Sequence, residues 1–320
     1  MRIYLAPMEG VIDYHVRKLY AKTGGVDGFT TEFIRVTDHL LPQKVFLRYC
    51  PELLHSATTN RSRYLVRIQL LGSDPNLLAE NAHKAASLGA HGIDLNFGCP
   101  AKTVNKNRGG ACLLNETELL HRIAAAVRRA VPATVPVSAK IRLGYEGRNS
   151  YLENATALAA AGISELIVHA RSKVDGYHPP AYWKCIGEIR ERVKIPLIAN
   201  GEIWSIGDYQ RCRHLSGCAD VMLGRGLLAR PDLALAIKAL HEDTVHREYS
   251  WRQAAVLLAQ FHFDTKDRYP KKFLGNRVKQ WLYYLQHHYP EAGILFEKIK
   301  KTRDEFSLSH ALQQQIRLNH

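Results

Sequence analysis

The stretch GIDLNFGCP, residues 92–100, joins an apolar run to a cysteine that stands between glycine and proline. The run GIDLNFG is typical of a buried β-strand. Pro100 ends this run, because proline has no backbone N–H to donate to a sheet. Cys99 is therefore predicted at the end of a strand, just before the basic loop KTVNKNRGG (102–110).

Outward from this stretch, β-rich runs alternate with helical patterns. The β-rich runs are residues 2–7, 28–34, 65–72, 92–98, 136–144, 165–171, 196–203 and 220–226. Helix boundaries between them are clear: one helix is expected to start at Asp74-Pro75 and stop at Gly89, and another lies over 116–131. Eight βα units in about 230 residues predict an α/β fold, a TIM (β/α)8 barrel, rather than an open sheet.

Strand signals disappear after Pro231. The remaining sequence contains helical patterns such as WRQAAVLLAQFHF (251–263) and RVKQWLYYLQHHY (277–289). We therefore predict two domains, a catalytic TIM barrel over residues 1–240 and a small all-helical domain over residues 241–320. The helical domain is mildly basic, as a nucleic-acid-binding domain or an ordinary solvated helical surface would be.

Composition suggests a polyanionic partner. The chain has 320 residues, with 44 Lys and Arg against 30 Asp and Glu, and a formal net charge of +14. Basic proteins that bind no nucleic acid also exist, so charge alone leaves the partner open. No apolar run approaches the roughly 20 residues of a membrane span, and no signal pattern is visible, so a cytoplasmic protein without membrane contact is expected.

The cysteines do not indicate a metal site or disulfides. They stand at positions 50, 99, 112, 185, 212 and 218, form no CxxC pair and lie near no HxxxH pattern. A cytoplasmic protein is expected to keep them reduced. Packing is the expected role of Cys50, Cys185, Cys212 and Cys218.

Candidate active-site residues close every β-rich run. In a TIM barrel the chemistry lies at the C-terminal ends of the strands. The residues at these ends are Met8 and Glu9, Glu32 and Arg35, Gln69, Asn96 and Cys99, Lys140 and Arg142, His169 and Arg171, 200–202, and Gly224 with Arg225. A single Lys140 or His169 in an apolar strand would more often be a satisfied interior group. Their coincidence at one rim predicts an active site.

The last two runs carry a phosphate-site pattern. ANGEI (199–203) and LGRG (223–226) place glycines where a backbone approaches a ligand closely, and Arg225 can pair with negative charge. TIM barrels commonly bind phosphate after strands seven and eight.

Taken together and in this order, several motifs resemble the tRNA-dihydrouridine synthases over essentially the whole chain. They are PMEGVID (7–13), NFGCPAKTV (96–104), VSAKIRLG (137–144), VHARS (168–172), ANGEI and GRG (224–226). PMEGV with Glu9, TEFIRV (31–36) and RVKQW (277–281) are most similar to the bacterial C subfamily. The resemblance implies FMN as cofactor, NADPH as reductant, and reduction of the C5=C6 bond of a tRNA D-loop uridine, at position 16 in the C subfamily.

The resemblance also implies the role of each site residue. The cofactor-binding residues would be Pro7, Met8, Glu9, Gln69, Lys140, His169, Asn200, Gly201, Glu202, Gly224 and Arg225, the last five at the flavin phosphate. The tRNA-binding residues would be Asn96 at the uracil edge, Arg171 at a phosphate or sugar, and Arg35, Arg277, Lys279 and Lys300 on the tRNA body. Tyr177 is a candidate for stacking on the target base, or an ordinary loop aromatic.

Cys99 would be the catalytic acid. Addition of hydride at C6 of uracil leaves a carbanion whose C5 must receive a proton. A thiol with a pKa of about 8.5 is mostly protonated at neutral pH and can donate that proton. Lys102, Lys106 and Arg108 could lower this pKa by favouring the thiolate, or could face tRNA phosphates instead.

Two other functions stay open. One is a flavin barrel that reduces a free pyrimidine, similar to the dihydroorotate dehydrogenases, which would have little use for a net charge of +14. The other is a non-catalytic RNA-binding barrel, against which the intact Cys99, Lys140, His169 and Arg225 argue. No protein partner is inferred, and a monomer is expected.

Overall fold

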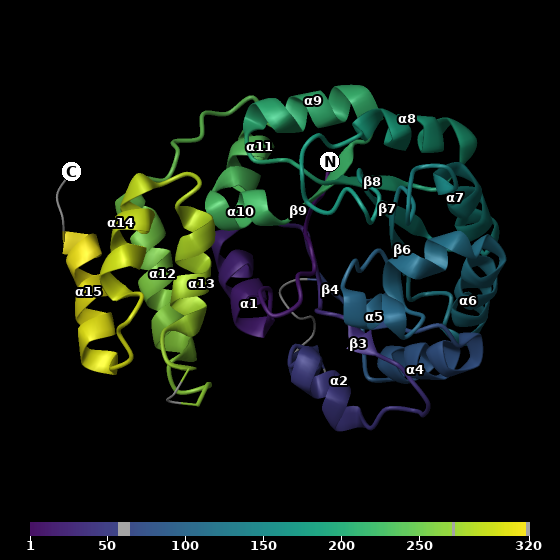
Figure 1. The fold of residues 1–320 in the computed structure, drawn as a ribbon, viewed down its shortest axis with the longest axis horizontal. Helices are drawn as coiled ribbons and strands as arrows, with labels where there is room; N and C mark the ends of the chain where they lie inside the picture. The colour runs from purple at the N-terminus through teal and green to yellow at the C-terminus, as the bar shows by residue number, and fades with distance from the viewer. Residues whose placement is uncertain (57–64, 271–272, 318–320) are drawn as a thin grey trace.

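The protein forms a closed barrel with a group of helices beside it (Figure 1). A computed structural model describes residues 1–56, 65–270 and 273–317. The strands of these ranges are β1 (Ile3–Leu5), β2 (Gly28–Thr30), β3 (Ile34–Arg35), β4 (Leu65–Leu71), β5 (Gly92–Phe97), β6 (Val137–Arg142), β7 (Glu165–His169), β8 (Leu197–Asn200) and β9 (Asp220–Leu223). No helix in the same ranges is long and apolar enough to cross a bilayer.

All strand pairs are parallel, and two pairings close the barrel. β1 pairs with β9, and β2 pairs with β4, so eight strands form a ring that leaves β3 as a short extension beside β4. The predicted run 28–34 is thus split into β2 and β3. Between them the side-chain oxygen of Thr31 accepts the backbone N–H of Gln69 at 3.0 Å, so a side chain takes a place in the hydrogen-bond ladder.

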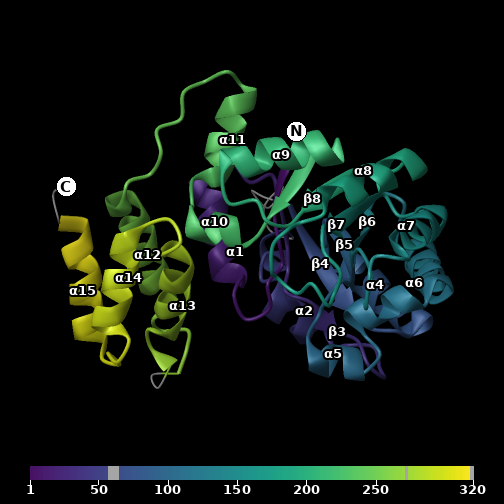
Figure 2. The same ribbon diagram turned by 45° about the horizontal axis from the view of Figure 1, so that its top comes forward.

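Helices surround the ring (Figure 2). They are α1 (Tyr14–Thr23), α2 (Gln43–Tyr49), α3 (Leu53–Ser56), α4 (Pro75–Ser87), α5 (Lys102–Lys106), the 3-10 helix η1 (Gly110–Asn115), α6 (Thr117–Ala130), α7 (Tyr151–Ala160), α8 (Trp183–Arg192), α9 (Ile206–Ser216), α10 (Arg225–Ala229) and α11 (Leu233–His241). The start signal of α4 is confirmed: Asp74 accepts the N–H groups of Asn76 and Leu77, both at 2.9 Å. The predicted TIM barrel is confirmed.

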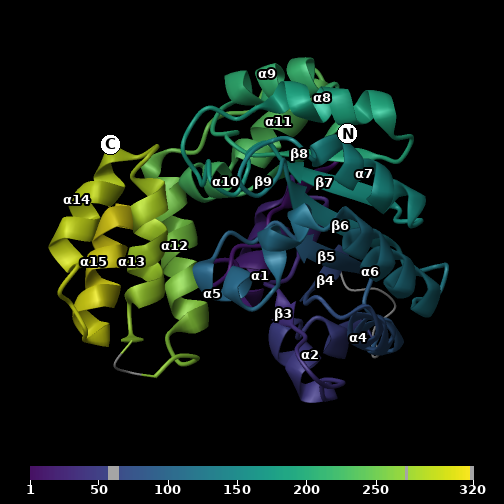
Figure 3. The ribbon, with the colours of Figure 1, turned by 45° about the vertical axis from the view of Figure 1, so that its right-hand side comes forward.

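The C-terminal helices are α12 (Trp251–Thr265), α13 (Asn276–Leu285), α14 (Pro290–Ile299) and α15 (Glu305–Arg317), and they lie on one side of the barrel (Figure 3). α13 is hydrogen-bonded to the barrel. The indole N–H of Trp281 donates to the Leu228 carbonyl at 3.0 Å, and Arg277 donates to the Val11 carbonyl at 2.7 Å. A domain boundary at residue 240 remains a prediction.

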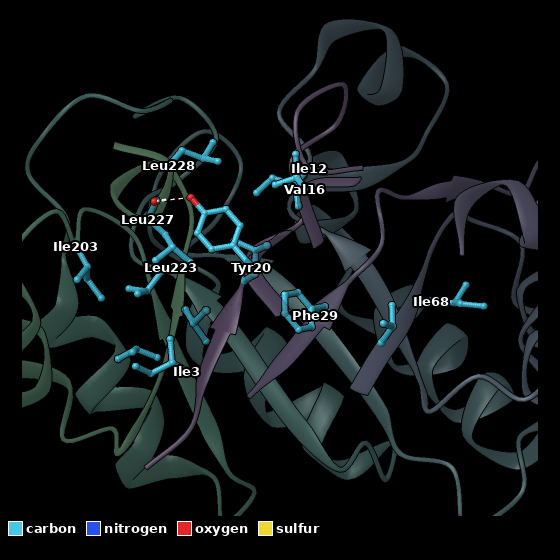
Figure 4. Close-up of a cluster of buried hydrophobic side chains, with 14 of the residues drawn as sticks. Ile3, Ile12, Val16, Tyr20, Phe29, Ile68, Ile203, Leu223, Leu227 and Leu228 are labelled. Carbon is cyan, nitrogen blue, oxygen red and sulfur yellow. Dashed lines mark hydrogen bonds between the residues drawn. The ribbon is translucent and has the colours of Figure 1, made fainter. Parts of the chain in front are cut away.

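Two buried apolar clusters hold the barrel together. The larger one fills the space between strands and helices, where the Tyr20 hydroxyl donates to the Leu227 carbonyl at 2.7 Å (Figure 4). The smaller one joins four strands and consists of Tyr4, Ala6, Ile167, Ile198 and Met222. Ala6 and Met222 also line the cavity at the C-terminal ends of the strands, so this cluster forms part of its floor.

Candidate active site

A cavity of about 640 Å³ opens at the C-terminal ends of the strands. This volume is in the range of small-molecule and cofactor sites. Among its lining residues are all eleven predicted for the cofactor, namely Pro7, Met8, Glu9, Gln69, Lys140, His169, Asn200, Gly201, Glu202, Gly224 and Arg225. Cys99, Asn96 and Tyr177 line it as well. The structure therefore brings the predicted catalytic acid and the residues predicted to contact the target nucleobase to the same place.

The turn that carries Cys99 is fixed by the strand before it. The side-chain oxygen of Asn96 accepts the backbone N–H groups of Gly98 at 3.0 Å and Cys99 at 2.9 Å. The Asn96 amide donates to Gln69 at 2.8 Å, and the Gln69 amide donates to Asp94 at 2.7 Å. Asn96 therefore positions Cys99, a role that the sequence did not indicate, and its contact with uracil remains a prediction.

A second asparagine holds the same turn from the loop side. The Asn105 amide donates to the carbonyls of Cys99 at 2.9 Å and Ala101 at 2.8 Å, and its oxygen accepts the N–H of Cys112 at 2.7 Å. Gly110 has a φ of 68°, and a Cβ atom there would lie 2.8 Å from the Cys99 carbonyl oxygen. A side chain at Gly110 would push against the turn, so glycine is required here because the Cys99 carbonyl lies so close.

The Cys99 thiol is held in its protonated form. Burial raises its pKa above the ordinary value, against the opposing effects of the Ala101 N–H and of Arg142. Of the two alternatives for Lys102, Lys106 and Arg108, an effect on this pKa gains no support, because the cations that lower it are Arg142 and Lys140. Arg108 instead pairs with Glu116 at 3.1 Å.

Lys140 and His169 also titrate far from their ordinary ranges. Burial, with Arg142 as a like charge, lowers the pKa of Lys140 to about 8. Burial, with Arg142 and Lys140 as neighbouring cations, lowers the pKa of His169 well below its ordinary value. The imidazole is therefore neutral at physiological pH. Perturbed groups gathered in one cavity are typical of an active site.

The ends of β8 and β9 form a corner of the cavity in which the backbone packs closely against a neighbouring side chain. Two arginines and one glutamate give this corner an excess of positive charge. Gly201 has a φ of 113°, and a Cβ atom there would lie 2.6 Å from the His169 ring. Glu202 bonds to the Arg171 guanidinium and lies 3.4 Å from that of Arg225, so one carboxylate faces two cations. A phosphate group fits such a corner.

Arg171 does not face the solvent. Its side chain is fully buried, its Nε donates to the His178 carbonyl at 2.6 Å, and it pairs with Glu202. The predicted contact with a tRNA phosphate or sugar therefore needs correction, because no part of the guanidinium is accessible. Arg171 supports the corner and the following loop from behind.

The four cations predicted to contact the tRNA body lie outside the cavity. Arg35 is exposed at the end of β3. Arg277 donates to the carbonyls of Gly10 and Val11 and pairs with Asp13 at 3.0 Å. Two more bind within the helical part: Lys279 donates to the Thr302 carbonyl at 2.7 Å, and Lys300 pairs with Glu297 at 2.5 Å. Arg277, Lys279 and Lys300 thus have structural contacts that the sequence did not indicate.

The cavity is also lined by Arg142, for which the sequence indicated no role beyond its position at a strand end, and by Trp204, Tyr283 and Tyr284, which were not predicted. Arg142 donates to the carbonyls of Gly98 and Ser172, both at 2.9 Å, and so ties the Cys99 turn to the loop after β7. Its place at a strand end was a usable signal, as was that of Trp204 directly after ANGEI. No local signal marks Tyr283 and Tyr284, which come from α13.

The fold resembles solved barrel enzymes that share little sequence with it. An old yellow enzyme homologue from Zymomonas mobilis aligns with a TM-score of 0.51 at 16% identity, over 79% of this chain and 91% of that one. Histamine dehydrogenase from Rhizobium sp. 4-9 aligns with a TM-score of 0.56 at 13% identity, over 82% of this chain and 48% of that one. Fold and site together define a TIM-barrel enzyme with a cofactor cavity at the strand ends.

The sequence profile of the dihydrouridine synthases, Dus, matches residues 4–318, and the chain belongs to this family. It is 50% identical to the tRNA-dihydrouridine(16) synthase of Pseudomonas putida, over 98% of this chain and 96% of that protein. A protein of the same name from Haemophilus influenzae is 47% identical, over 94% of this chain and 95% of that protein. The resemblance inferred from the motifs is confirmed, and the family defines a flavin-dependent enzyme.

Proposed function

We propose that the protein reduces the C5=C6 bond of uridine 16 in the tRNA D-loop, with FMN as its cofactor and NADPH as the reductant. One observation carries the proposal: two asparagines hold the backbone of Cys99 from both sides, in the same cavity as Lys140 and the phosphate corner. The position follows the names of the relatives, which are about half identical over nearly the whole chain.

The cavity residues fit a flavin mononucleotide. Gly201, Gly224 and Arg225 would hold its single phosphate, and Lys140 would lie at the polar edge of its ring. When bound, the flavin supplies hydride chemistry. A lysine with a pKa of about 8 is mostly charged at neutral pH, so it can stabilise the negative charge that reduction creates and can also release a proton.

Cys99 performs the proton step. Its thiol remains protonated at neutral pH because it is desolvated, and Asn96 and Asn105 hold its backbone on both sides. The proton passes from the sulfur to C5 of the uracil as the C5–H bond forms, and the thiolate is left beside Arg142 and Lys140. The target base must leave its stack to reach this depth, where Tyr177 lies at the rim.

The helical segment after residue 240 would bind the tRNA body, and the protein would act as a monomer in the cytoplasm. A reductase of free pyrimidines and a non-catalytic barrel are both less compatible with this chain. A reductase of free pyrimidines would not need a basic helical segment. The second would leave unexplained why Cys99, Lys140 and His169 are held with perturbed pKa values in one cavity.

Mapping dihydrouridine in tRNA from a strain that relies on this enzyme alone tests the proposal. Dihydrouridine is expected at position 16, and its appearance at 17 or 20 with 16 untouched would contradict the assigned position. Heat-released cofactor should run as FMN. Recovery of FAD, or faster reduction by NADH than by NADPH, would contradict the corresponding part of the proposal.

A further inference from the structure

One wall of the cavity does not belong to the barrel. Tyr283 and Tyr284 lie on α13, yet both line the cavity together with the strand-end residues. α13 is held there by Trp281 and Arg277, which hydrogen-bond to backbone carbonyls of the barrel. The position of these two tyrosines is therefore fixed relative to Cys99.

The tyrosines continue a row of aromatic rings, which we call the aromatic row: Tyr177, Trp204, His287, Tyr283 and Tyr284. Arg225 joins its first two members, with its guanidinium carbon 5.0 Å from the ring centre of Tyr177 and 5.1 Å from that of Trp204. Trp204 lies 5.4 Å from His287, which lies 6.0 Å from Tyr283. The row thus runs from a strand-end loop to the surface of α13.

Two tyrosines of the aromatic row, Tyr177 and Tyr283, are about half exposed to solvent, but their neighbours differ. Tyr177 is 53% exposed, and its ring lies 6.1 Å from that of His169 and 5.2 Å from the Arg142 guanidinium, so it sits at the rim directly beside the strand-end residues. Tyr283 is 56% exposed and lies edge-on to its neighbours Tyr284 and His287. Edge-on neighbours support the ring while leaving its face available.

We propose that Tyr283, supported by His287, is a stacking platform for a second nucleotide of the tRNA D-loop, next to the uridine that enters the cavity. The inference rests on the proposed function. Unpaired RNA bases stack on exposed aromatic rings, and any base can do so, because every base has a π-face. The net charge of +14 favours approach of the RNA backbone to the protein.

Binding of tRNA to Tyr283→Ala and Tyr283→Phe tests the platform, with unmodified tRNA transcript as the probe and full-length, flavin-loaded protein. Loss of one stacked base should raise the Kd for tRNA by roughly 5- to 150-fold in Tyr283→Ala, whereas Tyr283→Phe keeps the ring and should bind as the wild type does. Phe306→Ala is the matched control, because Phe306 is 82% exposed on α15 and does not line the cavity.

A transcript with an abasic nucleotide on either side of uridine 16 completes the test. If Tyr283 stacks on that neighbour, the abasic tRNA should bind wild-type protein more weakly but bind Tyr283→Ala no more weakly than intact tRNA does. NADPH reduction of the flavin should keep its rate and KM in both variants. A raised KM for NADPH in Tyr283→Ala with unchanged tRNA binding would overturn the proposal in favour of an adenine contact.

The remaining outcomes are also decisive. If Tyr283→Phe and Tyr283→Ala lose the same amount of tRNA affinity, the hydroxyl group of Tyr283 makes the contact rather than its ring. That result would overturn the stacking platform. If wild-type protein binds tRNA and forms dihydrouridine while Tyr283→Ala matches it, the platform alone is refuted. If wild-type protein forms no dihydrouridine, the proposed function fails first and the platform fails with it.

Discussion

The side-chain oxygen of Asn96 accepts the backbone N–H of Cys99 at 2.9 Å. Asn96 lies in β5, directly opposite Lys140 of β6 in the strand register. The thiol is therefore positioned by a strand of the barrel and not only by its own loop. This arrangement gives Cys99 and Lys140 a common rigid support.

Replacing Cys99 by alanine should leave flavin content and tRNA affinity unchanged while dihydrouridine formation falls about 10²- to 10⁴-fold, because the carbanion at C5 loses its acid. Single-turnover measurements with prereduced enzyme would show this. Cys112→Ala is the matched control, since Cys112 is a half-buried cysteine of the same loop whose thiol contacts the Gly109 carbonyl. An undiminished rate in Cys99→Ala would remove this residue from the mechanism.

Asn105→Ala should lower the single-turnover rate by roughly 10- to 100-fold, because a displacement of the thiol by about 1 Å is costly. The variant loses two hydrogen bonds to the Cys99 turn and one from Cys112. The KM for NADPH should not change. Asn107→Ala is a suitable control, since its amide bonds only to the Thr103 carbonyl among its described contacts. Equal rates in the two variants would contradict a positioning role for Asn105.

Oxidation of the reduced enzyme by tRNA should slow as the pH rises. Lys140 is charged below a pKa of about 8 and neutral above it, so its stabilising charge is lost through this range. Cys99 has a raised pKa and keeps its proton beyond that point. Stopped-flow traces should therefore show a first decline near pH 8. Lys140→Gln should be slower and lack this decline, whereas persistence of the decline in that variant would assign it to another group.

Arg225→Ala should weaken flavin binding by about 1.5–3 kcal/mol, or roughly 10- to 150-fold in Kd, because a charged hydrogen-bond donor to the phosphate is removed. Titration of stripped protein with FMN would measure the loss. Arg211→Ala is the control, because Arg211 is 70% exposed on α9 and pairs with Asp208. Equal FMN affinity in both variants would place the phosphate elsewhere.

Arg277 and Arg35 should separate into a structural and an RNA-binding role. Arg277→Ala removes the side-chain donor of the Val11 carbonyl and one donor each of the Gly10 carbonyl and Asp13, so the free energy of unfolding should fall by about 1–3 kcal/mol. Arg35→Ala should keep the melting temperature and reduce the salt dependence of tRNA binding by about 0.7–0.9 logarithmic units. An unchanged melting temperature for Arg277→Ala would restore a purely RNA-binding role.

The strands were predictable because parallel barrel strands are buried on both faces, so residues such as Ile93 and Leu95 stand in nearly continuous apolar runs. The cavity residues were predictable because barrel chemistry lies at strand ends. The burial of Arg171 was not. β7 ends at His169, and the Arg171 N–H donates to the His169 carbonyl at 2.7 Å, so the extended alternation of side chains stops there.

Contacts between distant parts of the chain could not be predicted from the sequence either. The helical pattern of α13 is clear, but which of its faces meets the barrel depends on Trp281 and Arg277 finding carbonyl partners more than 50 residues away. For the same reason Tyr283 and Tyr284 gave no sign of reaching the cavity. Arg277 was read as a free surface cation because local sequence does not reveal its acceptors.

The wall formed by α13 has a consequence for how the enzyme is made. Protein synthesis proceeds from the N-terminus and domains generally fold in that order, so every barrel strand emerges from the ribosome before Tyr283 and Tyr284 do. A nascent barrel therefore has a cleft that is open on one side. The cavity gains its remaining wall only when α13 is translated and folds back, so the site is completed after the barrel itself.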